Sequence, residues 1–337
     1  MHEGEASTDP ALVRRLLRDQ FPRWAHLPVT RLASGGTVNA IYRLGDELTV
    51  RLPLLAGGAE DLDDEARWLP RLAPLLPVPI PEVVALGEPA EGYPHRWAIH
   101  RWLDGEVLHE GEASDDLARD LAAFVTTLRR AADPAHTAHT ADSALADGPA
   151  HTADGPAHTA DGPAHTAADP SHTAAHTALA DGPRAYRGAP LRTVDDGTRA
   201  AIEELRRTDE PFDADALLAA WDTALQAPDW TAAPCWTHSD LMPGNLLGAG
   251  GRLAGVLDFG TAGVGDPAVD LIPAWNLLTP GTRRVFRDGA DTDDATWARG
   301  RGWALSMAAT QLPYYRHTNP VISANARYVL HQILDDR

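Results

Sequence analysis

The segment that most constrains this chain is WTHSDLMPGNLL, Trp236 to Leu247, which is soon followed by GVLDFG, Gly255 to Gly260. Pro and Gly break the first stretch into a loop, whereas NLLGAGGRLAGVLD reads as two strands joined by a Gly-rich turn. Such a hairpin brings Asn245, at its start, close to Asp258, at its end. Because Asp240 lies on the loop before it, the sequence predicts two carboxylates and an amide around one point.

These side chains suit phosphoryl transfer. Mg²⁺ takes oxygen ligands from one or two carboxylates and from substrate phosphates. HSDLMPGN matches H-x-D-x-x-x-x-N, whose Asp accepts the proton of the attacking hydroxyl and whose Asn binds metal, and DFG supplies a second metal-binding Asp. A His-x-Asp pair is usually a capped turn, and DFG alone occurs by chance. Their joint occurrence, in the correct order and with a strand leading into DFG, predicts kinase-type chemistry.

Composition narrows the partners of this 337-residue chain. Its formal net charge of −19 makes nucleic acid and anionic membranes poor partners and would attract a cationic small molecule. The single cysteine excludes an intramolecular disulfide. The N-terminal residues do not have the pattern of a secretory signal, and no apolar run is long enough to span a bilayer, so we expect a cytoplasmic protein without an obligate protein partner. All 29 basic residues are arginine, so chemistry that usually needs lysine must use arginine.

The pattern along the chain predicts two regions. A helix capped by Asp9 is followed by strand-like segments, by a helix in EDLDDEARWLPRL and by two further strands, which together make a small α+β half. From about Ser114 the pattern becomes helical, and it stays mainly helical from Gly197 to the C-terminus. We therefore expect an N-terminal lobe over residues 1–103 and a larger C-terminal lobe over 104–337.

A repetitive segment interrupts the second region at about residues 133–182. The triplet HTA occurs seven times in it, and AHTADGP repeats at an interval of seven residues. Gly-Pro in each unit and the lack of apolar a/d positions exclude a coiled coil. The spaced histidines could suggest a metal site, but the composition favours a disordered, expanded loop.

The residues around the motifs resemble the aminoglycoside phosphotransferase family. The resemblance rests on WTHSDLMPGNLL and GVLDFGTAGVGDPAVDLIPAW, together with LTVRLP, DDEARWLPRLA, WAIHRWLDGE and YRGAPL. A protein kinase would instead need a long activation segment and an A-P-E motif after DFG. The resemblance implies an α+β, two-lobed protein-kinase-like fold, with a small antiparallel sheet in one lobe. It also implies transfer of the γ-phosphoryl group of ATP or GTP to a hydroxyl of a small molecule.

The resemblance also implies roles for individual residues. Asp240 is the expected catalytic base, and Asn245 and Asp258 are the expected ligands of Mg²⁺. His238 is expected to brace the catalytic loop rather than to react. Asp270 resembles a buried Asp that holds this loop by backbone hydrogen bonds, although an ordinary helix-capping carboxylate is nearly as good an interpretation.

The N-terminal lobe departs from the kinase template because LTVRLP places Arg51 where a phosphate-binding lysine is expected. Arginine suits the position, since its planar fork binds phosphate oxygens and stays charged. Glu65, on the inner face of the next helix, is the expected partner of Arg51, and Asp61 is the alternative. The SGGT turn is the other expected phosphate-binding element, with Ser34, Gly35, Gly36 and Thr37. The stretch from Ile99 to Leu103 joins the lobes and is expected to offer backbone groups to the purine base, with Ile99, His100 and Arg101 as the named candidates.

The acceptor is the least determined part of the prediction. We expect an antibiotic-like sugar hydroxyl and favour aminoglycosides over macrolides, because the C-terminal lobe carries acidic patches: Asp195, Asp196, Glu203, Glu204, Asp288, Asp291, Asp293, Asp294, Asp335 and Asp336. Exposed carboxylates are, however, often plain solvated surface. The alternatives are a metabolic kinase for choline, homoserine or a sugar, and a catalytically silent nucleotide-binding module. An intact set of Asp240, Asn245 and Asp258 argues against the silent module.

Overall fold

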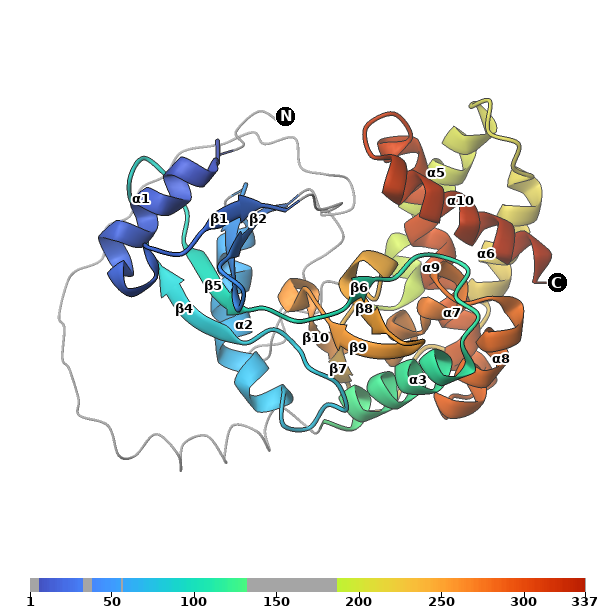
Figure 1. Cartoon of the computed structure of the whole chain (residues 1–337). Helices are drawn as coiled ribbons and strands as arrows, with labels where there is room; N and C mark the ends of the chain where they lie inside the picture. Colours follow the sequence, from blue (N-terminus) through green and yellow to red (C-terminus); the bar gives the residue numbers. More distant parts are fainter. Residues whose placement is uncertain (1–5, 33–37, 56, 132–186, 337) are drawn as a thin grey trace, which may run out of the picture.

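A computed structural model describes residues 6–32, 38–55, 57–131 and 187–336. The chain forms two lobes, a small one that contains a sheet and a larger helical one (Figure 1). In this part of the chain, no helix is long and apolar enough to cross a membrane. The SGGT turn and the HTA repeats, for which the sequence predicts a phosphate-covering turn and an expanded loop, lie outside the described residues.

The small lobe is built on an antiparallel five-stranded sheet in the order β1-β2-β3-β5-β4. The strands are β1 Val29–Arg31, β2 Asn39–Leu44, β3 Leu48–Pro53, β4 Val83–Gly87 and β5 Trp97–Arg101. Neighbours in sequence pair wherever a short turn allows it, and β5 inserts between β3 and β4. These strands confirm the predicted ones.

Helix α1 (Pro10–Gln20) packs on this sheet and contributes to a core of its own. Asp9 caps the helix by accepting the backbone N–H of Leu12 at 2.6 Å, and Pro10 occupies its first position. Its apolar residues recur on one face and are buried against strand residues such as Tyr42 and Val50. The small lobe therefore has a hydrophobic core that the large lobe does not share.

Helix α2 (Gly57–Leu72) connects the two lobes physically. Trp68, Leu69 and Leu72 are buried, but they belong to the large core of the C-terminal lobe rather than to the core of the small one. Trp68 packs edge-to-face on Trp236, just before the HSD motif, with ring centroids 5.1 Å apart. Because Glu65 lies one turn before Trp68 on the same face, α2 couples the sheet to the catalytic loop.

The large lobe combines helices with two small sheets. Its helices are α3 Asp115–Arg130, α5 Asp195–Arg206, α6 Ala214–Leu225, α7 Pro273–Asn276, α8 Pro280–Gly289, α9 Asp294–Tyr315 and α10 Pro320–Asp335, with the 3-10 turns η3 Leu191–Val194, η4 Pro243–Asn245, η5 Phe259–Thr261 and η6 Pro267–Leu271. The sheets are β6-β8-β9 (Glu106–Val107, Leu246–Ala249, Arg252–Val256) and β10-β7 (Gly263–Gly265, Cys235–Thr237). Strand β7 leads into the HSD loop, and strand β9 leads into DFG.

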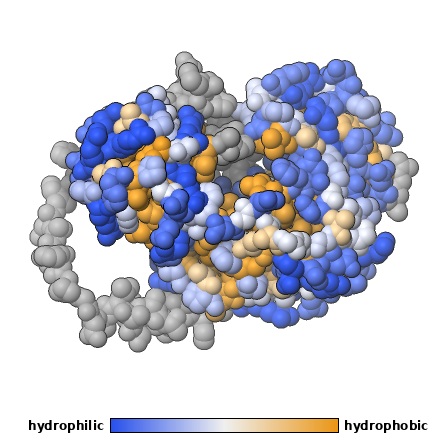
Figure 2. Space-filling view, in the orientation of Figure 1, coloured by the Kyte–Doolittle hydropathy of each residue, from blue (hydrophilic) through white to orange (hydrophobic). Residues whose placement is uncertain are grey.

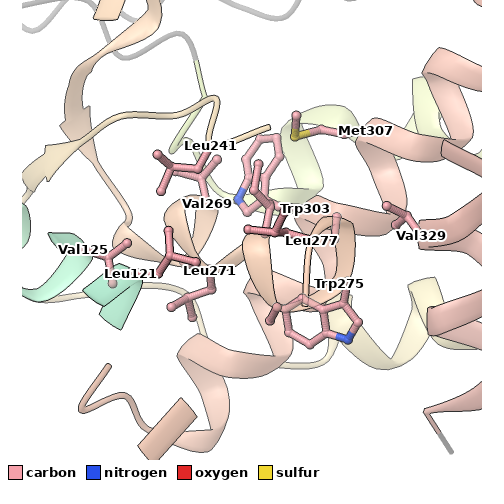
Figure 3. Close-up of a cluster of buried hydrophobic side chains, with 14 of the residues drawn as sticks. Leu121, Val125, Leu241, Val269, Leu271, Trp275, Leu277, Trp303, Met307 and Val329 are labelled. Carbon is pink, nitrogen blue, oxygen red and sulfur yellow. The ribbon is translucent and has the colours of Figure 1, made fainter. Parts of the chain in front are cut away.

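The core of the large lobe lies directly beneath the motif loops. Leu121 and Val125 of α3, Val269 and Leu271 of η6, and Trp275 meet there (Figure 3). In the face shown, hydrophilic residues cover the outer surfaces of both lobes and apolar residues gather where the lobes meet (Figure 2). The predicted α+β, two-lobed fold is confirmed, and the boundary near residue 103 stays a prediction.

Candidate active site

The HSD loop is fixed by a buried carboxylate. Asp270, on η6, accepts the backbone N–H groups of His238 and Ser239, each at 2.8 Å. Burial raises the pKa of Asp270 to about 6, although His238 and these two hydrogen bonds oppose the rise. Ser239 has a φ of 67°, a left-handed conformation that costs a residue with a side chain, and the surrounding hydrogen bonds hold it there.

His238 ties this loop to the segment that leads into DFG. Its ring is fully buried, and its Nε2 lies 2.9 Å from the carbonyl oxygen of Leu257. The ring also packs edge-to-face on Phe259, with centroids 4.6 Å apart. Thr261 donates to the His238 carbonyl oxygen at 2.9 Å. These contacts suit the bracing role expected for His238 and leave its ring away from solvent.

Asp240 projects from this loop with both carboxylate oxygens engaged. Its Oδ1 accepts from Arg187 Nη1 at 2.8 Å, and its Oδ2 accepts from Asn245 Nδ2 at 3.1 Å. The Asp240 side chain is 23% exposed, so it is held but accessible. Asn245 also donates to the backbone carbonyl of Asp240 at 2.9 Å, which closes the loop over the 3-10 turn η4.

The predicted hairpin between the motifs is present. Strands β8 and β9 pair antiparallel, and Gly250 and Gly251 make the turn with positive φ angles of 58° and 75°. Glycine suits both positions because a tight two-residue hairpin turn requires φ > 0. After the hairpin, Leu257 donates its backbone N–H to the Asn245 carbonyl at 2.8 Å, which places Asp258 beside Asn245 in the fold.

Arg51 joins the small lobe to DFG. Its Nη1 donates to Glu65 Oε1 at 2.7 Å, and its Nη2 donates to Asp258 Oδ1 at 3.2 Å. Burial works against the charge of Arg51, but Glu65 and Asp258 outweigh it and the pKa is raised. Burial likewise works against the charge of Glu65, yet Arg51 and His100 lower its pKa to about 2. The predicted pairing of Arg51 with Glu65 is confirmed.

Asp61, the alternative partner, lies near enough to Arg51 for their charges to interact. The ion pair at 2.7 Å is made by Glu65 instead. Burial raises the pKa of Asp61 to about 7, although Arg51 opposes the rise. A Cβ added to Gly260 would approach the Cβ of Asp61 to 3.3 Å and Arg51 Nη2 to 3.4 Å. The absence of a side chain at Gly260 therefore lets DFG pack closely against α2.

The segment that joins the lobes differs from the expectation. Ile99, His100 and Arg101 lie in β5, between β3 and β4, so their backbone groups are engaged in the sheet on both sides. The side chain of His100 points instead to the site, with Nε2 at 3.5 Å from Glu65 Oε2. The side chain of Arg101 is half exposed and pairs with Glu82 at 2.7 Å. The backbone groups of these three residues are thus used in the sheet, and their part in nucleotide binding stays a prediction.

Two neighbouring residues fit a magnesium ion. Asn245 uses its amide nitrogen to bind Asp240, which leaves its Oδ1 as the ligand atom. Asp258 has a side chain that is 45% exposed, and its φ of 58° turns it out of the strand direction of β9. One carboxylate and one amide oxygen, with phosphates and waters completing the shell, form a donor set that Mg²⁺ accepts.

The sequence did not reveal two further features of the site. Arg187 contacts Asp240, although more than fifty residues separate them along the chain. Asp266 and Arg299 form a buried ion pair, with Nε to Oδ2 at 2.6 Å, behind the strand β10. The segment YRGAPL belonged to the family resemblance, but nothing in it indicated which carboxylate its arginine would meet.

The fold and these motifs define a phosphotransferase of the two-lobed, protein-kinase-like class. The model of the phosphotransferase enzyme family (APH) matches residues 29–303 of the chain. The chain therefore belongs to this family, which confirms the predicted family and the predicted class of enzyme. No curated protein matches the chain.

Solved structures of antibiotic phosphotransferases share the fold. The GDP complex of aminoglycoside 2'-phosphotransferase-IIIa has a TM-score of 0.63 at 18% identity, with 98% of this chain and 99% of that chain covered. The GDP and kanamycin complex of APH(2")-IIia has 0.62 at 20%, covering 96% and 99%. Macrolide 2'-phosphotransferase MphH from Brachybacterium faecium has 0.53 at 21%, covering 98% and 99%. At these identities the likeness shows the fold.

Proposed function

We propose that the protein transfers the γ-phosphoryl group of ATP or GTP to a hydroxyl of a small organic molecule in the cytoplasm. The observation that carries this proposal is the grouping of Asp240, Asn245 and Asp258: Asn245 donates to Asp240, and its carbonyl accepts the N–H of Leu257, the residue before Asp258. Arg51 extends the set to the small lobe through Asp258. A silent module would have no use for a held but accessible carboxylate at Asp240.

The residues take the following parts in the reaction. Asp240 accepts the proton of the acceptor hydroxyl, whose oxygen forms the new bond to the γ-phosphorus while the nucleoside diphosphate leaves. Arg51, oriented by Glu65, binds phosphate oxygens of the nucleotide. Asn245 and Asp258 are the residues that would hold Mg²⁺, and the bound ion would neutralise charge on the phosphates. Asp270 and His238 fix the loop that carries Asp240.

The nucleotide base needs a place other than the backbone of β5. The strand pairing ends at Arg101, and Trp102 then donates its N–H to the Glu47 carbonyl at 2.7 Å. Leu103 and Asp104 follow in the connection to the large lobe. We place the base against the backbone of these two residues, and the donor is either ATP or GTP.

The acidic patches that favoured an aminoglycoside lose much of their weight. Six of the ten carboxylates bind arginines or cap helices in the large lobe, namely Asp195, Glu203, Asp291, Asp293, Asp294 and Asp336. Each of these charges is thereby offset within the protein or used at a helix end. These carboxylates therefore favour a polycationic acceptor less than their number in the sequence suggests.

The apolar side chains near the catalytic loop serve the core of the large lobe. The cavity lined by Met242, Asn276, Ala304 and Met307 has a volume of only about 10 Å³, which is room for one water and not for an acceptor. The large aromatic side chains Trp221, Trp275, Trp297 and Trp303 are buried in the same core. Within the class of sugar-bearing antibiotics, aminoglycosides and macrolides therefore both stay candidate acceptors.

One screen tests the function and the acceptor together. Release of ADP or GDP is measured with ATP or GTP and Mg²⁺ against macrolides, aminoglycosides, choline and homoserine, with Asp240→Ala as the inactive control. We expect turnover with at least one antibiotic, and the preferred compound identifies the acceptor class as aminoglycoside or macrolide. Turnover with choline or homoserine alone would reject the antibiotic acceptor.

A further inference from the structure

Arg187 meets the carboxylate of Asp240 directly. One nitrogen, Nη1, donates both to Asp240 Oδ1 at 2.8 Å and to the Ser239 carbonyl oxygen at 3.1 Å. The side chain of Arg187 is 15% exposed, less than that of Asp240, so the pair lies partly sheltered at the surface of the site. A charge-assisted hydrogen bond of this length fixes the carboxylate more firmly than a neutral one would.

The backbone of Arg187 is itself held in place. Its carbonyl oxygen accepts the hydroxyl of Ser239 at 2.8 Å, and the carbonyl of the next residue, Gly188, accepts the N–H of Asp266 at 2.8 Å. A Cβ on Gly265 would lie 2.8 Å from that carbonyl, so the two segments touch without room for a side chain. The arginine is therefore attached to the same loop whose carboxylate it binds.

The buried pair behind this contact gives it a rigid base. Asp266 accepts from Arg299 Nε at 2.6 Å and from its Nη2 at 3.2 Å, and both side chains are almost fully buried. Asp266 also caps η6, since its side chain accepts the N–H of Ala268 in the first turn. A chain of hydrogen bonds thus runs from the core of the lobe through Gly188 to the segment that carries Arg187.

The two aspartates of the site are paired in parallel ways. Arg51 reaches Asp258 from the small lobe, and Arg187 reaches Asp240 from the large lobe. Because Asn245 holds the other oxygen of Asp240, the carboxylate plane is fixed from both sides. An acceptor hydroxyl must approach a carboxylate whose direction is already set, and attack in line with a phosphorus atom depends on that direction.

We propose that Arg187 is a positioning residue for phosphoryl transfer, which acts by orienting the carboxylate of Asp240 toward the acceptor hydroxyl. The inference rests on the proposed function, since it needs Asp240 to act as the base. It also gives the segment YRGAPL a part in the reaction. Misplacement of a reacting group by about 1 Å costs on the order of 10²-fold in rate, so loss of the arginine should lower kcat by about that factor.

The test compares Arg187→Gln, Arg187→Lys and Arg187→Ala with the wild type and with a matched control, Arg192→Gln. Arg192 lies in the same segment, but it pairs with Asp229 at an exposed site. Phosphoryl transfer is measured with the acceptor found in the screen, and also to water as ATP and GTP hydrolysis in Mg²⁺. Nucleotide KM and the midpoint of thermal unfolding are recorded for each variant.

We expect kcat to fall about 10²-fold in Arg187→Gln and Arg187→Ala, with nucleotide KM unchanged and a melting temperature equal to that of Arg192→Gln. Arg187→Lys should recover part of kcat, and added guanidinium ion should do so in Arg187→Ala. A kcat within threefold of wild type in Arg187→Gln, or equal losses in all variants including the control, would overturn the inference alone. A wild type that transfers phosphate to no acceptor and not to water would overturn the proposed function and the inference with it.

Discussion

At the scale of single residues, the two aspartates of the motifs divide the work. Asp240 is held at both oxygens yet remains accessible, whereas Asp258 is paired with Arg51 at one oxygen and is half exposed. Asp240 faces the acceptor and Asp258 faces the nucleotide in the proposed reaction. Substitutions at the two positions should therefore affect different kinetic constants.

Replacing Asp240 by Ala should abolish transfer while leaving nucleotide affinity nearly intact. The side chain accepts a proton from the acceptor, and removal of a general base costs about 10²–10⁴-fold in rate. Turnover and the nucleotide dissociation constant, measured on the same preparation, check this. A variant that retains more than half of the wild-type turnover would show that another group is the base.

Asp61 predicts a dependence of stability on pH. Burial raises its pKa from 3.8 to about 7, so the folded state favours the protonated form. This stabilisation is fully present below the unfolded value and is lost as the pH rises through about 7. Without nucleotide or Mg²⁺, Asp61→Asn should therefore gain stability relative to wild type between pH 5 and pH 8, by about 1–2 kcal/mol after allowance for partial exposure.

Urea unfolding of wild type and Asp61→Asn at the two pH values checks this sign. If the difference in unfolding free energy is the same at pH 5 and pH 8, Asp61 does not titrate in this window. If the difference moves in the opposite direction, the attraction of Arg51 outweighs the cost of burial.

At the scale of elements, α2 is the part that one mutation should disturb most. Its face carries Glu65 toward Arg51 and Trp68 toward the core of the other lobe. Trp68→Ala should destabilise the protein by about 3–5 kcal/mol, the usual cost of removing a buried aromatic ring. Leu75→Ala is a matched control, because that side chain is 48% exposed just after the helix and should change stability by about 0.5 kcal/mol or less.

Chemical denaturation of both variants measures the two costs. If Trp68→Ala lowers the free energy of unfolding by no more than Leu75→Ala does, the stability of the protein does not depend on the contact of Trp68 with Trp236. A loss in the expected range, together with weaker nucleotide binding, would show that the helix transmits its packing to Arg51.

Much of this arrangement could be predicted from local sequence. The pattern of EDLDDEARWLPRL predicted a helix with Glu65 on its inner face, and the Gly-rich turn predicted the hairpin that brings Asn245 beside Asp258. Both depend on residues that are neighbours in the chain, where periodicity and turn chemistry act directly. The pairing of Arg51 with Glu65 followed because a strand and the next helix are usually adjacent.

The remaining features depend on contacts that local patterns do not encode. Strand β5 lies inside the sheet rather than at its edge, so its backbone groups pair with both neighbouring strands. That position depends on the strand order of the whole sheet. The contact of Arg187 with Asp240 joins segments far apart in sequence. The pairing of surface carboxylates with arginines likewise arises when helices pack, so a count of acidic residues in the sequence does not reveal it.

At the scale of the whole molecule, the site is shared by two lobes that have separate hydrophobic cores. Arg51 and Glu65 come from the small lobe, and Asp240, Asn245 and Asp258 from the large one. A ligand that binds at this junction makes contacts with both lobes. Its binding energy therefore adds to the stability of the folded molecule as a whole.

A nucleotide with Mg²⁺ should raise the melting temperature of the wild type. A ligand that binds the folded state alone stabilises it by RT ln(1 + [L]/Kd), about 2.7 kcal/mol at a concentration 100 times Kd. The rise should be much smaller in Arg51→Ala, which loses the phosphate contact, and should fall in Asp258→Asn or with excess EDTA, which remove the metal. Asp240→Ala should keep the full rise, because its carboxylate serves the acceptor and not the nucleotide. An equal rise in all four proteins would show that the nucleotide binds elsewhere, and loss of the rise in Asp240→Ala would show that this carboxylate belongs to the nucleotide site.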